Sequence, residues 1–378
     1  MTERERILKI LNGEVVDRIP WIPRLKIWYI AHKKNNTLPE KYRNSTLREI
    51  ERDLGMGNPA REGKIYNVVL HNVEKRVIRE GGEIITEYIT PIGTVFEKQV
   101  LTPELERVGI EELEKREHLI KRSEDYSVVE YIIEHTEYVP CFEEFEAYDC
   151  EIGEEGLSSV LSGECPMFEI MLNYVGYERF YYELYDRPEK IEHLHELLSE
   201  KMEEVHRIMV ESPAILFRHG EHFDSQLTPP PIYKKYFLPY YKRLSRQIHD
   251  HGKFLAVHLD ADTRLLLDLI YESGFDVADA FTTAPMVRCT LKQAREVWED
   301  RVVIWGGIPS IILCEGYPED DFREQIEKIF RVVAPGRAFI FGVGDNIMPE
   351  TKFDRLLFVG EMITRWGTYP MSLPETGL

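Results

Sequence analysis

The sequence has no apolar run of about 18 residues, the length that crosses a bilayer, and its opening "MTERERILKI" has no hydrophobic signal core. Neither a membrane span nor a secretory signal is expected, so the chain is predicted to be cytoplasmic. Basic residues are also scarce, with 47 against 67 acidic residues and a net charge of −20. Such a chain repels a phosphate backbone and an anionic lipid surface, which argues against nucleic-acid and membrane partners.

Cysteine is scarce as well. The five cysteines of the 378 residues form no CxxC pair, and an odd number in a cytoplasmic chain argues against a disulfide framework. Glycine-rich phosphate loops are missing, since no GxGxxG or GxxxxGK[ST] follows any predicted strand. What the chain does have is 43% hydrophobic residues, enough for a large core.

The first half of the chain gives several local predictions. Thr2 and Glu5 form a capping box for a short N-terminal helix, and "DRIPWIPRLKIWY" is typical of a first strand and its loop. From about residue 60 to 160 the pattern is that of β-hairpins, with turns at Gly81-Gly82 and Gly93. We interpret this region as an insertion or flap.

A long amphipathic helix is predicted in "PEKIEHLHELLSEKMEEVHRIM". Its apolar face consists of Ile191, Leu194, Leu198, Met202, Val205 and Met209. The histidines of this helix are predicted to be surface residues on its polar face: His193, His195 and His206.

The last 165 residues or so alternate strand and helix patterns five times. The strands are "AILFR", "FLAVH", "DVADAF", "VVIW" and "AFIFGV", each followed by an amphipathic helix. Five βα units predict a parallel sheet, and with earlier strands a (β/α)8 TIM barrel, residues 1–378 forming a single domain. A doubly wound open sheet is the alternative.

Polar residues follow these strands where a barrel places its active site. His258 and Asp260, two residues apart, point to the same side and can share one metal ion. Asp279 or Asp345, from later strands, would supply a further ligand. The alternative is structural: Asp260 caps the next helix and His258 forms a core hydrogen bond. Four neighbouring strand ends of this kind favour the metal.

Other side chains near the predicted mouth are less specific. Glu221 and His222 follow "AILFR" and are candidates for ligands or for acid–base catalysis. Aromatic residues of this region are core residues in most barrels, but some would line an apolar, ring-shaped pocket. The candidates for this pocket are Trp28, Tyr29, Phe281 and Trp305.

Four stretches together resemble the uroporphyrinogen decarboxylase superfamily: "RERILKILNGEVVDRIPW", "YYELYDRPEKIEHLHELLSEKM", "PPPIYKKYFLPYYKRLSRQIHDHGKFLAVHLDAD" and "GVGDNIMPETKFDRL". The resemblance implies a (β/α)8 barrel. The superfamily includes the decarboxylase itself and cobalamin-dependent methyltransferases. The decarboxylase has two arginines four residues apart for its substrate's propionates. Here Arg24 matches the first of these arginines, but Trp28 stands at the position of the second. The cation that would pair with a second propionate is therefore missing.

The branch that methylates thiols has HxC and a later GC as zinc ligands. This chain has His258-Leu259-Asp260 and Gly344-Asp345 at those positions, so both cysteines are replaced by aspartate. A carboxylate-rich metal site suits an oxygen of the substrate better than a thiolate-rich one. The resemblance therefore points to the O-demethylases, which pass a methyl group from a methoxylated aromatic compound to a corrinoid protein. "PWIPRLKIWY", "HLDAD", "ADAFTTAPM" and "VVIWGGIP" are similar to that branch.

The resemblance implies a divalent metal, expected to be zinc, and a corrinoid carried by a partner protein. The implied metal ligands are His258, Asp260, Asp279 and Asp345; Glu221 or His222 would donate a proton, and Arg24 would hold a carboxylate on the ring. A homodimer is a further expectation. Three alternatives stay open: a methylcobamide:thiol methyltransferase, a decarboxylase-like lyase, and a catalytically silent barrel that binds a ligand or protein.

Overall fold

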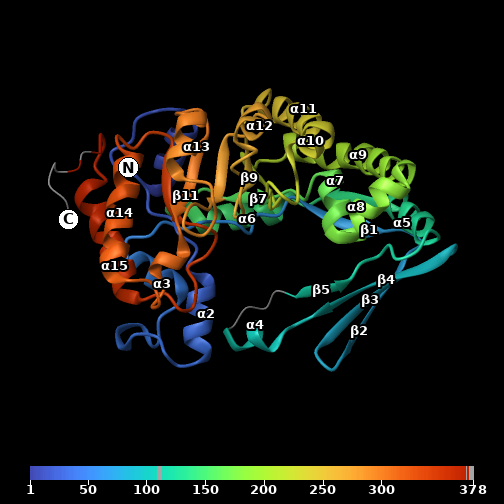
Figure 1. The fold of residues 1–378 in the computed structure, drawn as a ribbon, viewed down its shortest axis with the longest axis horizontal. Coiled ribbons are helices and arrows are strands. Elements are labelled where there is room, and N and C mark those ends of the chain that lie inside the picture. Colours follow the sequence, from blue (N-terminus) through green and yellow to red (C-terminus); the bar gives the residue numbers. More distant parts are fainter. Residues whose placement is uncertain (109–112, 372, 374–378) are drawn as a thin grey trace. The chain divides into compact units, whose positions relative to one another are not determined.

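The computed structural model describes residues 1–108, 113–371 and 373. They form two compact units (Figure 1). The first contains Met1–Gly63, Phe145–Leu161 and Ala214–Leu378, and the second contains Lys64–Glu144 and Ser162–Pro213. Most of the predicted insertion at 60–160 lies in the second unit, which also takes in 162–213. The description of the chain as a single domain stays a prediction.

Parallel strands form the centre of the first unit. The sheet has the order β12-β11-β10-β9-β8-β7. Its strands are β7 (Ser159–Leu161), β8 (Leu216–His219), β9 (Phe254–His258), β10 (Val277–Phe281), β11 (Val303–Ile308) and β12 (Phe339–Val343). All five predicted βα units are present, and the prediction of an α/β barrel is confirmed. The alternative of an open doubly wound sheet is excluded because the sheet closes through the bridges of Trp21 to β12 and of Gly63 to β7.

Two short segments complete the ring of strands. Trp21 forms a parallel bridge to Phe341 of β12, and Gly63 forms one to Val160 of β7. These segments meet each other, because the Gly57 amide donates to the Trp21 carbonyl at 2.8 Å. The sheet thus closes on itself, with six regular strands and two irregular ones.

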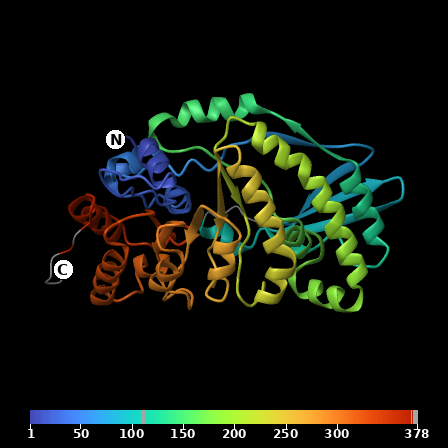
Figure 2. The same cartoon turned by 90° about the horizontal axis from the view of Figure 1, so that it is seen from above.

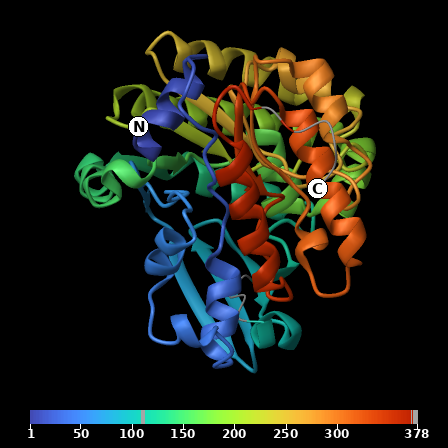
Figure 3. The same cartoon turned by 90° about the vertical axis from the view of Figure 1, so that its left-hand side faces the viewer.

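Helices surround the strands and succeed one another in chain order from α11, in yellow, to α15, in red (Figure 2). The aromatic contacts Phe330–Trp366 and Phe322–Phe358 hold α14 and α15 side by side (Figure 3). The helices of this unit are α1 (Glu3–Leu11), α2 (Lys26–Lys34), α3 (Leu47–Asp53), α10 (Pro230–Ile232), α11 (Leu238–His249), α12 (Leu267–Glu272), α13 (Leu291–Trp298), α14 (Glu319–Val333) and α15 (Phe353–Trp366). A further helix, α6 (Phe142–Ile152), contains the chain boundary between the units.

The beginning of the chain follows the sequence prediction only in part. The capping box of Thr2 and Glu5 is present at the start of α1. Trp21 occupies a strand position, as predicted, but the prediction of a loop after it was wrong for residues 26–29, which begin α2. The segment "KIWYIAHKK" continues at helical spacing and buries Trp28, Tyr29 and Ala31 on one face. This helical periodicity only becomes visible beyond residue 29. A prediction from residues 17–29 alone therefore took the start of α2 for a loop.

The barrel interior changes from apolar to polar along the strands. One layer is a buried cluster in which helix α1 also takes part through Ile7 and Ile10. The strands contribute Leu216, Ala256, Val277, Val303 and Ile340 to it. Two residues further along four of these strands come Arg218, His258, Asp279 and Trp305. Alternate strand residues share a face, so the layer nearer the carboxyl ends of the strands is largely polar.

The second unit contains the predicted hairpins. An antiparallel sheet of order β2-β3-β4-β5 comprises β2 (Glu74–Glu80), β3 (Glu83–Thr90), β4 (Gly93–Val100) and β5 (Glu114–Glu117). Gly81 and Gly82 form the two-residue turn between β2 and β3 with positive φ angles. The remaining elements are the paired strands β1 (Tyr66–Leu70) and β6 (Thr136–Pro140) and the helices α4 (Pro103–Val108), α5 (Asp125–Glu134), α7 (Pro166–Glu169), α8 (Tyr177–Asp186) and α9 (Pro188–Glu211).

Helix α9 is the predicted amphipathic helix, and its predicted apolar face is buried. The prediction that His206 is a surface residue was wrong, because it is only 2% exposed. His206 lies four residues after Met202 and three before Met209, which puts it on the buried side of the helix. Among the described residues, no helix is both long and apolar enough to cross a membrane.

The approach of β10 to β11 allows a test of the barrel. The register between these strands shifts at Asp279/Phe281, and a Cβ on Gly306 would lie 2.6 Å from the Phe281 nitrogen. Gly306 also has φ +142°. We expect Gly306→Ala to lower the free energy of unfolding by about 1–3 kcal/mol, because the backbone of β10 must shift. Urea unfolding monitored by circular dichroism measures this.

Gly316→Ala is the matched control, since a Cβ there has no atom within 4 Å. It should change the free energy of unfolding by less than about 0.5 kcal/mol. Equal effects of the two substitutions would contradict the described packing of β10 on β11.

Candidate metal centre

His258 and Asp279 form the buried part of a polar cluster at the carboxyl ends of the strands. They are direct partners in the register of β9 and β10, so their side chains point to the same face next to each other. His258 Nδ1 lies 3.1 Å from Asp279 Oδ2. The second carboxylate oxygen, Oδ1, accepts a hydrogen bond from Arg61 Nη1 at 2.5 Å. Both oxygens of Asp279 are therefore engaged.

The other nitrogen of His258, Nε2, faces a second group of side chains. It lies 3.6 Å from Asp260 Oδ2 and 3.5 Å from Asp345 Oδ1. Asp260 Oδ1 is in turn 2.7 Å from His222 Nδ1, and the two imidazole rings are 5.1 Å apart, edge to face. His258 is buried and His222 is about half exposed. The cluster thus runs from the barrel interior outward.

Three of these side chains are arranged as metal ligands would be. One ligand atom each from His222, His258 and Asp260 can be chosen so that all three lie within 4.8 Å of one another. Two imidazoles and a carboxylate are a donor set that zinc accepts. The contact of His258 Nδ1 with Asp279 fits as well, since histidine ligands of metals commonly donate their second N–H to a carboxylate. The residues present therefore fit a divalent metal.

Asp345 lies at the edge of this group. Its carboxylate forms an ion pair with Arg24, and it accepts a hydrogen bond from the Asn346 side-chain amide at 2.6 Å. Its backbone has φ +60°, an uncommon conformation for a residue other than glycine. Asp345 is thus held within reach of His258 while a cation already balances its charge.

The cluster favours a positive charge at its centre. Burial acts to lower the pKa of His258, but hydrogen bonds with Asp260, Asp279 and Asp345 outweigh it and raise this pKa to about 10. Burial likewise acts to raise the pKa of Asp260, and hydrogen bonds from His222 and His258 lower it well below its usual range. Carboxylates that favour an imidazolium electrostatically also favour a bound cation.

Glu221, predicted to be catalytic, is fully buried. Its Oε1 is 3.5 Å from His219 Nδ1, and the same nitrogen is 3.3 Å from the Tyr241 hydroxyl of α11. Its neighbour His222 belongs to the group of His222, His258 and Asp260. The two predicted catalytic residues thus have different surroundings, and only His222 lies beside Asp260.

The aromatic residues predicted to line a pocket are all buried. The Trp28 indole donates to the Thr351 carbonyl at 3.4 Å, and the Tyr29 hydroxyl donates to the Ser45 carbonyl at 3.1 Å. Phe281 packs edge-on against Trp298, and the Trp305 indole donates to the Ile22 carbonyl at 3.0 Å. These contacts are those of core residues, and a role in substrate binding stays a prediction.

Two arginines of the cluster were missed by the sequence predictions. Arg218 is the inward-facing residue at the end of β8, so the strand alternation that identified His258 also identifies it. Burial, and next Arg61, lower the pKa of Arg218 to about 9, which leaves it cationic at neutral pH. Arg61 comes from the irregular segment before Gly63, where the sequence has no periodic pattern that would have revealed it.

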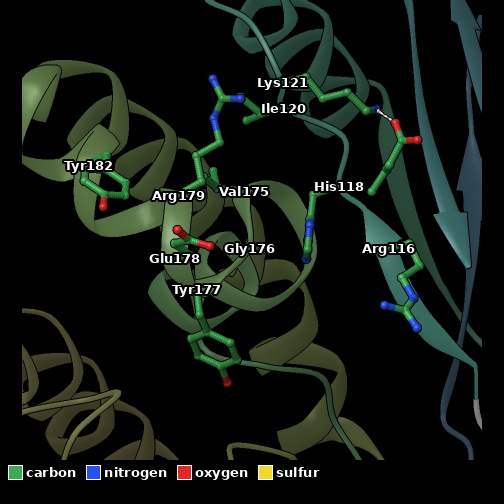
Figure 4. Close-up of a pocket in the computed structure, with 11 residues that line it drawn as sticks. Arg116, His118, Ile120, Lys121, Val175, Gly176, Tyr177, Glu178, Arg179 and Tyr182 are labelled. Atoms are coloured by element: carbon green, nitrogen blue, oxygen red, sulfur yellow. Dashed lines mark ion pairs between the residues drawn. The ribbon is translucent and has the colours of Figure 1, made fainter.

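The second unit has a pocket of about 460 Å³. It lies between the N-terminus of α8 and residues 116–121 (Figure 4). Cations and carboxylates line it together, and Lys121 is 3.8 Å from Glu117. Arg179 pairs with Glu183, and Arg116 pairs with Glu114. Because these cations have carboxylate partners, the pocket offers no clear preference for an anion.

Comparison with known proteins agrees with this barrel. The model of the family "Uroporphyrinogen decarboxylase (URO-D)" matches residues 166–366, more than half of the chain. The chain belongs to the URO-D family. Curated URO-D relatives include the uroporphyrinogen decarboxylases of Thermus thermophilus, 27% identical over 173 residues, and of Syntrophotalea carbinolica, 27% identical over 147 residues. These matches cover 45% and 38% of this chain and 47% and 40% of the relatives. The matched region thus spans half or less of the length of these relatives.

A solved structure is similar in fold to nearly the whole chain. A methyltransferase from Methanosarcina mazei is similar with a TM-score of 0.57, covering 97% of this chain and 99% of the other. The two sequences are 14% identical. At this identity the likeness shows a shared fold.

A metal measurement tests the cluster. Purified without chelator, the protein should retain about one equivalent of a divalent ion per chain, as a closed or three-ligand site does. His258→Ala and Asp260→Ala should each lose this ion, because each removes one of the three clustered ligand atoms. Elemental analysis after gel filtration gives the content directly.

His249→Ala is the matched control, since His249 forms a similar exposed contact with Asp276 at 2.9 Å but belongs to no such cluster. It should retain the metal of the wild-type protein. Wild-type protein that takes up no metal after reloading would contradict the metal centre.

Proposed function

We propose that this URO-D family member is a metal-dependent methyltransferase that demethylates a methoxylated aromatic compound. The methyl acceptor is the reduced cobalt of a corrinoid carried by a separate protein. The observation that carries this proposal is the grouping of His222, His258 and Asp260 at the strand ends. These side chains provide nitrogen and oxygen donors at the place where a barrel binds its substrate.

The identity of the donors supports an oxygen-containing methyl donor over a thiol acceptor. Thiolate-rich sites suit soft partners, whereas carboxylates and imidazoles suit harder ones such as an ether oxygen. Asp260 and Asp345 occupy the positions where the thiol-methylating relatives are expected to have cysteines. The likeness in fold to a methyltransferase is compatible with the proposal, as is the membership in the URO-D family.

The ether oxygen needs stabilisation while the bond between it and the methyl carbon breaks. In the proposed transfer the methyl carbon leaves the ether oxygen for cobalt(I), and the electron pair of the broken C–O bond stays on the oxygen as an aryloxide. When bound, a divalent ion supplies a Lewis acid that lowers the cost of this negative charge. The aryloxide then takes a proton from water and leaves as a phenol.

Neighbouring residues of this chain orient the proposed metal ligands. Asp279 orients His258 through Nδ1, which directs Nε2 toward Asp260 and Asp345. Arg24 and Asn346 fix the carboxylate of Asp345. His222, half exposed at the outer edge of the cluster, lies on the side open to solvent. We propose His222 as a metal ligand in preference to a proton donor, because its Nδ1 is directed at Asp260.

A lyase acting on a porphyrinogen is the second candidate, favoured by the curated relatives, which are uroporphyrinogen decarboxylases. Arg24 would hold a carboxylate of such a substrate. Against it stands Trp28, which is fully buried and donates to the Thr351 carbonyl, so this position presents no cation to a propionate.

The proposal predicts methyl transfer in a reconstituted assay. Metal-loaded protein, a reduced corrinoid protein and methoxybenzoates should yield the phenol together with a methylated corrinoid, followed by its absorbance. Asp260→Asn should slow the transfer about 100-fold or more, since it removes a charged ligand atom. His249→Ala should transfer at the wild-type rate.

The other outcomes identify the alternatives. Methylation of a thiol by the methylated corrinoid, without ether cleavage, would replace the proposal by the thiol methyltransferase. Metal-independent decarboxylation of uroporphyrinogen would replace it by the lyase. No turnover of any of these substrates by metal-loaded protein would favour a catalytically silent barrel.

A further inference from the structure

The segment that carries Arg61 is held in an unusual backbone conformation. Ala60 has φ +45°, which lies in the left-handed region where a residue with a Cβ is strained. Three hydrogen bonds keep it there. The Ala60 amide donates to Asn58 Oδ1 at 2.9 Å, while the Ser159 amide and hydroxyl both donate to the Ala60 carbonyl, at 2.9 and 3.1 Å. Strain that is maintained in this way is a feature of functional sites.

Arg218 fixes the next residue. Its Nη2 donates to the Arg61 carbonyl at 2.6 Å, and its Nε donates to Ser159 Oγ at 2.9 Å. Arg218 therefore connects the end of β8, the first residue of β7 and the irregular segment that completes the ring. The backbone of Arg61 is fixed by contacts to two strands of the barrel.

The side chain of Arg61 then reaches across to β10. Its Nη1 donates to Asp279 Oδ1 at 2.5 Å, and its Nη2 is 3.5 Å from His258 Nδ1. Asp279 uses its other oxygen for His258 Nδ1. A continuous chain of contacts thus leads from Arg218 through Arg61 and Asp279 to His258, whose Nε2 belongs to the proposed metal centre.

We propose that Arg61 is a positioning residue for the metal centre, acting through Asp279 to fix the ring of His258 and the proton on its Nδ1. This inference rests on the proposed metal-dependent function. Without the guanidinium, the Asp279 carboxylate is free to rotate, and His258 loses the orientation that aims Nε2 at Asp260. Carboxylate partners of metal-bound histidines affect metal affinity in this manner. Here Asp279 is such a partner of His258, and Arg61 in turn holds Asp279.

The geometry requires an arginine. The fork of a guanidinium is planar and directs its N–H groups along fixed lines, so the hydrogen bond from Nη1 to Asp279 Oδ1 also fixes the orientation of that carboxylate. A lysine ammonium supplies the charge without this fork. Arg61→Lys is therefore expected to show an effect between those of the wild type and of Arg61→Gln.

Metal affinity tests the proposal without any assay of activity. The dissociation constant for Zn²⁺ is measured by competition with a chromophoric chelator, and the ligand geometry by the visible absorbance of the Co²⁺-loaded protein. Arg61→Gln should weaken Zn²⁺ binding about 10- to 100-fold and change the Co²⁺ spectrum. Arg61→Lys should weaken binding less, and Asp279→Asn should resemble Arg61→Gln. The double variant should show less than the sum of the two losses.

Arg4→Gln is the matched control, because Arg4 makes a paired contact with the Asp149 carboxylate at 2.8 and 2.9 Å outside the cluster. It should keep the wild-type dissociation constant and spectrum. If Arg61→Gln does not fold, Arg61→Lys carries the test alone. Variants of Arg61 that unfold more easily but bind Zn²⁺ and Co²⁺ as the wild type does would overturn the proposal. A wild-type protein that binds neither ion would instead overturn the proposed function itself.

Discussion

The contact between His258 Nδ1 and Asp279 Oδ2 determines how the rest of the site is arranged. It follows from the register of β9 and β10, in which the two residues are partners, and both are buried. A buried carboxylate requires positive partners, and here they are the imidazole and Arg61. Because Nδ1 is used in this way, Nε2 faces the strand ends, where Asp260, Asp345 and His222 converge.

Unusual backbone conformations surround this contact. Ala60, Ala280 and Asp345 all have positive φ angles without being glycine, and they lie beside Arg61, beside Asp279 and within the cluster. The bulge at Ala280 also brings Phe281 against Gly306, where only a glycine fits. The barrel supplies rigid strands, and these strained positions adjust where the polar side chains point. Precise placement of this kind is what a metal centre requires of its surrounding residues.

Much of this molecule could be predicted from its sequence. Hydrophobic alternation revealed the five βα units, and the polar residues after them indicated His258 and Asp260 as neighbours. The closed barrel was predicted, but the segment at Gly63 lacks alternation, so neither its place in the ring nor Arg61 could be predicted. His222 was identified, but not its proximity to Asp260, because that contact joins two loops through the fold. The aromatic residues are buried in core contacts, and sequence position near a strand end does not by itself distinguish a pocket residue from a core residue.

X-ray absorption spectroscopy of the Zn²⁺-loaded protein tests the metal centre most directly. The account predicts a first shell of nitrogen and oxygen atoms at about 2.0–2.1 Å, with the outer-shell pattern of two imidazoles. The double variant His222→Ala/His258→Ala should lose that imidazole pattern. A sulfur shell at about 2.3 Å, or a spectrum without imidazole in the wild-type protein, would contradict a centre built from His222, His258 and Asp260.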